Sequence, residues 1–139
     1  MKLRIIVVLC TLFSFALNAC AQDIKRPDSY NYIRGIEAVE SRDFQSALEY
    51  LNKEIEENPK NGYAYSWIAI VRQQNEEYGK AITALNMAIK YLPKKDKSYR
   101  SWAFMMKSQI YQSIQEHENA ISCINQAIEL YKEELFTYS

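Results

Sequence analysis

Histidine is almost absent from this sequence, and so are the motifs that bring metal-binding or proton-transferring side chains together. His117 is the single histidine among 139 residues. It precedes Cys123 by six positions, about 240° around a helix, so the two side chains cannot share one ligand face. The chain has no HExxH, CxxC, GxSxG or phosphate-binding motif. We therefore predict no catalytic residue, no metal site and no cofactor, with His117 packing at a turn between helices.

The sequence also lacks a disulfide framework and a charge imbalance. Cys10 and Cys20 lie near the N-terminus, which leaves Cys123 as the one cysteine in the body of the chain. One thiol forms no framework, so stability must come from packing. Lys and Arg number 17, as do Asp and Glu. A nearly neutral chain argues against a nucleic-acid partner.

No apolar run is long enough to span a membrane. The longest is Ile5 to Leu17, after a start that carries Lys2 and Arg4, and small residues follow at 19–21. A spanning helix needs about 20 apolar residues. A basic start, a shorter apolar centre and a small-residue exit are typical of a secretory signal peptide. We expect residues 1–19 to be such a peptide and the protein to be exported.

The end of this segment leaves two cleavage sites open. Leu17-Asn18-Ala19-Cys20 resembles the lipobox of bacterial lipoproteins. The resemblance implies cleavage before Cys20, lipidation of Cys20, and a membrane-anchored protein facing the periplasm or the cell surface. Asn18 departs from the small residue usual at its place. The alternative is cleavage after Ala21, which would give a soluble periplasmic or secreted protein. We favour the lipoprotein.

The rest of the chain repeats itself every 34 residues. The recurring pairs are Ala47 and Ala81, Leu51 and Leu85, and Pro59 and Pro93. Two helices and two turns fit in this period, which predicts a helical hairpin stacked on copies of itself. A third copy is displaced by five residues, because Leu85 recurs as Ile124 after 39 positions. The fold class is therefore all-α, with about three helix–turn–helix hairpins.

The period sets the expected boundaries. Residues 20–27 form a tether and 28–139 the repeat domain, with repeats at about 28–61, 62–95 and 101–134 and an insertion at 96–100. Helices are expected at 29–41, 44–57, 63–74, 78–91, about 97–115 and 118–131. Asp43 is placed to cap the second helix. Glu54, near the end of that helix, is expected to be solvated.

Small residues recur where the two helices of a hairpin would touch. Gly35, Ala69 and Ser108 share one repeat position, and Ala47, Ala81 and Ala120 share another. Small side chains allow two helix axes to approach to the short end of the usual range of about 8–10 Å. In the third hairpin the residues expected to face inward are Ala120, Ile121, Ile124, Ala127 and Ile128.

This pattern resembles the tetratricopeptide repeat (TPR), a 34-residue helix–turn–helix with small residues at these positions and a closing proline. The resemblance covers about Asp28 to Tyr131 and implies a right-handed superhelix. The departures are Arg34 and Lys107 where the family prefers Leu, Glu54 where it prefers Ala, and Lys132 in place of the third proline.

The resemblance also implies a peptide-binding groove, which the first helix of each repeat lines. Carried over to this chain, the groove positions are Tyr32, Ile36, Val39, Tyr63, Ser66, Ile70, Gln73, Trp102, Met105, Gln109 and Gln112. Aromatic, aliphatic and amide side chains suit an extended or helical peptide. Tyr65 and Trp67 are expected to pack between repeats instead.

We expect a non-catalytic protein–protein interaction scaffold in the bacterial cell envelope. It would hold a protein or peptide in the groove and contact the membrane through its lipid anchor. Two alternatives stay open. One is a structural subunit of an envelope complex that self-associates and buries its last hairpin. The other is the N-terminal regulatory part of a longer enzyme.

Overall fold

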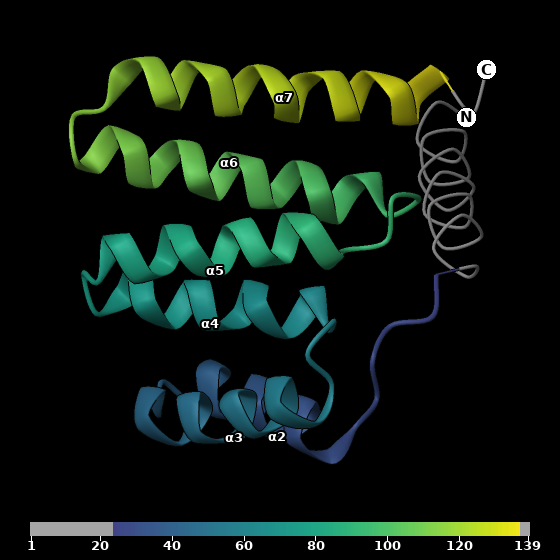
Figure 1. The fold of residues 1–139 in the computed structure, drawn as a ribbon, viewed down its shortest axis with the longest axis vertical. Coiled ribbons are helices and arrows are strands. Elements are labelled where there is room, and N and C mark those ends of the chain that lie inside the picture. The colour runs from purple at the N-terminus through teal and green to yellow at the C-terminus, as the bar shows by residue number, and fades with distance from the viewer. Residues whose placement is uncertain (1–23, 137–139) are drawn as a thin grey trace, which may run out of the picture.

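The computed structural model describes residues 24–136, which form six α-helices and no strand. The helices are α2 (Tyr30–Glu40), α3 (Phe44–Glu57), α4 (Gly62–Gln74), α5 (Tyr78–Tyr91), α6 (Lys97–Ser113) and α7 (His117–Phe136). Figure 1 shows three hairpins stacked along the long axis, with α2 and α3 at one end and α7 at the other. The expected all-α stack of three hairpins is confirmed. The expected signal peptide, the lipobox and Cys20 lie outside the described residues.

The turns inside the three hairpins share one backbone conformation. Arg42, Glu76 and Gln115 have φ angles of 61°, 58° and 63°, in the left-handed region. The next N–H in each turn returns to a carbonyl five residues earlier: Asp43 to Ala38 (2.9 Å), Glu77 to Arg72 (2.8 Å) and Glu116 to Tyr111 (2.8 Å). These are Schellman C-caps, built three times without the glycine that usually supplies the left-handed residue.

Side-chain caps start three of the helices. Asp43 accepts a hydrogen bond from the Ser46 N–H at 3.1 Å, as expected for the start of α3. Asn61 and Asp96 cap α4 and α6 in the same way. The α3 and α5 helices end just before Asn58-Pro59 and Leu92-Pro93, where a proline ring disfavours helical geometry in the residue before it.

The small residues lie at the contact between the two helices of each hairpin. A Cβ atom at Gly35 would lie 2.6 Å from Cγ of Leu51, so α2 approaches α3 more closely than any side chain at that position would allow. Ala47, Ala81 and Ala120 are buried. Ser108 uses its hydroxyl to donate to the carbonyl oxygen of Ala120 at 2.8 Å. The predicted role of the small residues is thus confirmed.

The outer helix of the third hairpin differs from the expectation. Ala120 and Ala127 face inward against α6, but Ile121, Ile124 and Ile128 are exposed, so the expectation for these three is wrong. Their counterparts in α5 are covered because α6 packs on α5. Within the described residues no further helix follows α7, and the same positions therefore face solvent.

Candidate peptide-binding face

Aromatic rings connect α2, α4 and α6, the first helices of the three hairpins. The indole Nε1 of Trp67 donates to the Tyr32 hydroxyl at 3.3 Å. Tyr63 and Tyr99 meet edge to face with ring centroids 4.9 Å apart, and Tyr99 lies 5.4 Å from Trp102. Edge-to-face contacts of this kind are worth about 0.5–1.5 kcal/mol beyond area burial. We call these five residues the aromatic row.

The aromatic row is anchored by a buried hydrogen bond. The Tyr63 hydroxyl donates to Oδ2 of Asp96 at 2.7 Å, and the other carboxylate oxygen of Asp96 caps α6. Burial, followed by the hydrogen bond to Asp96, raises the pKa of Tyr63 above its ordinary value. Burial likewise raises the pKa of Tyr99. These phenols stay neutral at physiological pH, so the row offers packing and not proton transfer.

Three of the expected groove residues are not accessible, and the expectation is corrected for them. Tyr32, Tyr63 and Ser66 are buried. Trp67 pairs with Tyr32, Tyr99 packs on Tyr63, and the Ser66 hydroxyl donates to the carbonyl oxygen of Gly62. Rings of the neighbouring first helix close over Tyr32 and Tyr63, which the repeat pattern alone does not show.

The other expected groove residues remain at least partly exposed. Those that are half-buried are Ile36, Val39, Ile70, Gln73 and Trp102. Met105, Gln109 and Gln112 are exposed and continue the line of Trp102 along α6 at helical spacing. We call Trp102, Met105, Gln109 and Gln112 the α6 strip. A role in binding stays a prediction for all of these residues.

The expected packing of the two other aromatic residues of α4 is partly observed. Trp67 joins two repeats through its bond to Tyr32. The Tyr65 ring stacks on Tyr91 within the second hairpin, with ring centroids 6.1 Å apart, while its hydroxyl donates to the carbonyl oxygen of Pro59 in the first repeat at 3.2 Å. The two α4 side chains therefore point to different partners.

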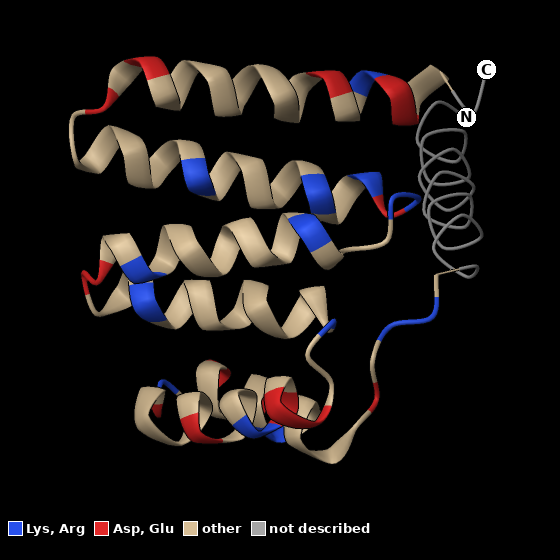
Figure 2. Cartoon of the chain, viewed as in Figure 1, with Lys and Arg blue, Asp and Glu red and all other residues tan. Residues whose placement is uncertain are grey.

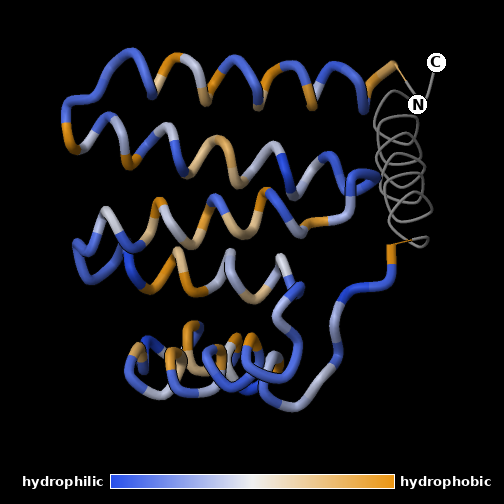
Figure 3. Tube along the Cα trace, in the orientation of Figure 1, coloured by the Kyte–Doolittle hydropathy of each residue, from blue (hydrophilic) through white to orange (hydrophobic). Residues whose placement is uncertain are grey.

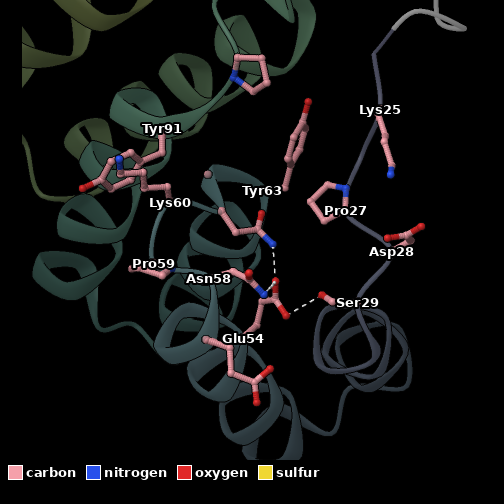
Figure 4. A pocket seen from close by; sticks show the side chains of 14 residues that line it. Lys25, Pro27, Asp28, Ser29, Glu54, Asn58, Pro59, Lys60, Tyr63 and Tyr91 are labelled. Carbon is pink, nitrogen blue, oxygen red and sulfur yellow. Dashed lines mark hydrogen bonds between the residues drawn. The ribbon is translucent and has the colours of Figure 1, made fainter.

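An open cleft of about 550 Å³ adjoins the aromatic row. It lies between the N-terminal segment, the α3–α4 turn and the end of α5, and Figure 4 shows Pro27 beside Tyr63 at its edge. Charged residues of both signs line it, namely Lys25, Asp28, Glu57 and Lys60. The cleft is thus a mixed polar surface with an aromatic wall.

Glu54 lies at the cleft but is not solvated, contrary to the expectation. Its side chain is 1% exposed and accepts hydrogen bonds from Ser29 (2.6 Å), Asn58 (3.1 Å) and Asn61 (2.8 Å). Figure 4 shows the bonds converging on the carboxylate. A buried carboxylate is tolerated when its oxygens are hydrogen-bonded in this way. Glu54 therefore ties the N-terminal segment to the α3–α4 turn.

The N-terminal segment, residues 24–29, lies against the aromatic row in a non-helical conformation. The Arg26 guanidinium stands over the Tyr99 ring at 5.3 Å from its centroid. A guanidinium within about 6 Å of a ring centroid makes a cation–π contact. One stretch of polypeptide thus already rests on the aromatic row, at the start of α6.

The residues considered for chemistry, His117 and Cys123, lie on α7, which contributes no residue to the aromatic row. His117 begins α7 and is exposed, so its expected packing at the turn is wrong. Cys123 is buried, and desolvation raises the pKa of its thiol. In residues 24–136 no three His, Cys, Asp or Glu side chains gather as a metal site would need. Over the same range, no helix combines the length and apolar character that a membrane crossing requires.

Parts of this chain match a known repeat family and a known protein. The model of the tetratricopeptide repeat matches residues 103–134, the third hairpin. Protein FlbA of Caulobacter vibrioides is 31% identical over 78 residues, which are 55% of this chain and 13% of FlbA. The chain therefore spans only a small part of that relative's length.

Solved structures share the fold at low sequence identity. A crystal structure of MamA superposes with a TM-score of 0.70 at 22% identity, covering 76% of this chain and 58% of that one. The TPR2B domain of yeast Sti1, solved as a complex with pHsp70, gives 0.67 at 20% identity and covers 74% and 78%. The third hairpin thus matches the sequence pattern of the tetratricopeptide repeat, and the stack of hairpins shares its fold with these solved structures.

Proposed function

We propose that this chain is a non-catalytic protein-interaction scaffold that binds a segment of a partner protein along the face of α2, α4 and α6. The observation that carries the proposal is the N-terminal segment, because this stretch of the chain itself rests on the aromatic row at the start of α6, with Arg26 over Tyr99. The face thus has contacts suited to an extended polypeptide. The Sti1 TPR2B domain, which has the same fold, was solved with pHsp70 bound.

The α6 strip is the part of this face that is open to a partner. Met105 is 42% exposed, and Gln109 and Gln112 are exposed beside it. None of these side chains is charged. Met contributes an adaptable apolar contact, and the amides donate to or accept from a peptide backbone. The partner segment is therefore expected to carry an apolar anchor and little charge along this strip.

A photo-cross-linking experiment tests the binding face. A photoreactive amino acid is placed at Gln109 or Gln112, and at exposed Asn119 on α7 as the control, and the cross-linked products are identified. Capture of a common partner from Gln109 and Gln112 but not Asn119, and its loss in Met105→Glu, would support the proposal. Equal capture from all three positions would contradict it.

We also propose that the protein is exported and anchored to the bacterial envelope through a lipid on Cys20. The basic start, the apolar run and the Leu17–Cys20 motif support this proposal. A diacylglyceryl and an N-acyl chain together exceed the threshold for stable anchoring. Cys20→Ser is expected to move the protein from the membrane fraction to the soluble fraction. Unchanged sedimentation with membranes would refute the lipid anchor, and N-terminal sequencing distinguishes cleavage after Ala21.

A further inference from the structure

The outer surface of α7 presents an uninterrupted apolar row. Its members are Ile121 (59% exposed), Ile124 (37%), Ile128 (45%), Tyr131 (57%) and Leu135 (57%). They recur at spacings of three and four residues, so they lie on one side of the helix. Figure 3 shows the hydrophobic positions recurring along α7, and Figure 2 shows no charge in its middle part. We call this surface the α7 face.

The repeat pattern identifies the residues of the second hairpin that are equivalent to the α7 face. Ile121, Ile124, Ile128 and Tyr131 stand 39 positions after Ile82, Leu85, Ile89 and Leu92. In the second hairpin those residues are buried or half-buried, since α6 packs on α5. The α7 face is therefore the surface that a helix covers in the preceding hairpin, left open here among the described residues.

The opposite end of the stack does not complement this surface. On α2, Arg34 and Glu37 are exposed and joined by an ion pair of 2.7 Å. Stacking the α7 face of one copy on α2 of the next would bury that pair against isoleucines. Desolvating charges without new polar partners is costly, so the charge pattern disfavours an open head-to-tail chain.

The α7 helix complements itself when two copies run antiparallel. Spacings of three and four residues are those of the a and d positions of a coiled coil. In the register that pairs Ile124 with Ile128 of the second copy, Ile121 meets Tyr131 of the second copy. Along one flank, Glu118 then faces Lys132 of the second copy, and Asn125 lies near the two-fold axis. The other flank holds Ala120 and Ala127, which are occupied by α6.

We propose that the α7 face binds the α7 helix of a second copy of this chain in an antiparallel, two-fold arrangement. Two equal Glu118–Lys132 contacts fix the register, and a two-fold contact closes on itself without forming a filament. Lys132 now pairs with Glu129 across one helical turn at 3.1 Å, and both side chains are exposed. Exchange of such a surface partner costs little. This contact leaves the face of α2, α4 and α6 free and is independent of the proposed function.

Charge reversal tests the partner and the register together. Protein expressed from the full sequence is measured by multi-angle light scattering and analytical ultracentrifugation over a concentration series. Glu118→Lys and Lys132→Glu are each expected to raise the dimer dissociation constant about tenfold, since each places like charges at both contacts. The double variant Glu118→Lys/Lys132→Glu is expected to restore the wild-type constant. Both positions are exposed, and circular dichroism verifies that each variant stays helical.

Cysteine cross-linking supplies a second measurement. Asn125→Cys places a thiol near the proposed axis, and mild oxidation should give a disulfide-linked dimer. Gln126→Cys is the matched control, because its side chain is exposed one residue further around the helix. Wild type, which has the same native cysteines, reports the background. Cross-linking at least several-fold faster for Asn125→Cys than for Gln126→Cys supports the proposal.

Three outcomes would overturn the proposal. One is a wild-type protein that is monomeric at every concentration tested, which would assign the α7 face to a different protein or to further polypeptide. Another is a dimer that neither single reversal weakens or that the double reversal does not restore. The third is equal cross-linking of Asn125→Cys and Gln126→Cys.

Discussion

The contact between Gly35 and Leu51 sets how closely α2 approaches α3. A Cβ atom at Gly35 would lie 2.6 Å from Leu51 Cγ and 2.7 Å from Cδ2, and Leu51 is fully buried. Gly35→Ala is therefore expected to destabilise the protein by about 1–3 kcal/mol through overpacking. This loss exceeds the gain of up to about 1 kcal/mol that alanine brings to a helix. Urea denaturation followed by circular dichroism measures the change.

Gly79 provides the matched control for Gly35. Apart from its chain neighbours and the nearby backbone of α5, no atom lies within 4 Å of a Cβ atom built at Gly79, in the first turn of that helix. Gly79→Ala is expected to stabilise the protein by up to about 1 kcal/mol, because only the helix preference of alanine acts there. If both variants were more stable than wild type, the close packing of α2 on α3 would be wrong.

The hydroxyl of Tyr63 is expected to stabilise the folded protein at neutral pH and to destabilise it at high pH. Tyr63→Phe leaves Oδ2 of the buried Asp96 without this donor, so we expect a loss of about 1–3 kcal/mol at pH 7. Burial raises the pKa of Tyr63 in the folded protein. Above about pH 10 the unfolded chain therefore loses this proton first, and stability falls as the pH rises.

The comparison of wild type with Tyr63→Phe isolates the contribution of Tyr63 ionisation to the pH dependence of stability. Each tyrosine with a raised pKa costs the folded state up to about 1.4 kcal/mol per pH unit above pH 10. The pKa of Tyr99 is raised as well, so part of the loss of stability at high pH remains in both proteins. The stability gap between wild type and variant should therefore narrow between pH 9 and 11 in urea titrations. A constant gap over this range would show that Tyr63 ionises as readily in the folded protein as in the unfolded chain.

The turns between paired helices hold an ordinary residue where glycine is the unstrained choice. Gln115 has a φ of 63° and is exposed. A non-glycine residue in this conformation costs roughly 1–2 kcal/mol, and the greater flexibility of glycine in the unfolded chain cancels part of any relief. We expect Gln115→Gly to raise the stability by about 0.5–1 kcal/mol, measured as a higher urea midpoint.

Gln112→Gly is the control for this prediction. Gln112 is also exposed, but it lies in the last turn of α6. Glycine in a helix costs up to about 1 kcal/mol relative to the best helix formers. The two variants should thus shift the midpoint in opposite directions. Loss of stability in both would mean that the side chain of Gln115 contributes more than its backbone costs.

Helices were predictable where short-range signals agree. Asp43 caps α3 as expected, and α3 and α5 end before Asn58-Pro59 and Leu92-Pro93. These signals act between residues a few positions apart, so a short stretch of sequence is enough to recognise them. The left-handed turn residues could not be predicted, because Arg42, Glu76 and Gln115 stand where a glycine would have marked this conformation.

The binding face was harder to predict because its accessibility depends on neighbouring repeats. The helical spacing places Tyr63 and Met105 equally on the first helices, but the Tyr99 ring buries only Tyr63. Glu54 looks like a solvated residue near a helix end. Its three donors come from Ser29, Asn58 and Asn61, up to 25 residues away along the chain. These contacts depend on how the chain folds around the α3–α4 turn and packs on its neighbours, which the 34-residue period does not specify.

Stacked hairpins make this a nearly one-dimensional molecule, in which each helix is stabilised by its neighbours along the stack. α5 is packed between α4 and α6, whereas α7 packs mainly on α6. Hydrophobic burial is correspondingly different, because α5 buries Leu85 completely while its counterpart Ile124 is 37% exposed. Local opening should therefore cost less at α7 than at α5.

Hydrogen exchange read by mass spectrometry should show this gradient along the stack. At a protein concentration where light scattering shows monomers, the α7 amides are expected to exchange at least tenfold faster than those of α5. Three residues on the third hairpin, Ser98, Lys97 and Ser101, bond to Glu134, Glu133 and Ala127 of α7, so protection will not vanish there. Raising the concentration should slow exchange in α7 alone if a second copy covers the α7 face. Equal protection of α5 and α7 in the monomer would mean that the stack unfolds as one unit, and that the exposed isoleucines of α7 carry no local penalty.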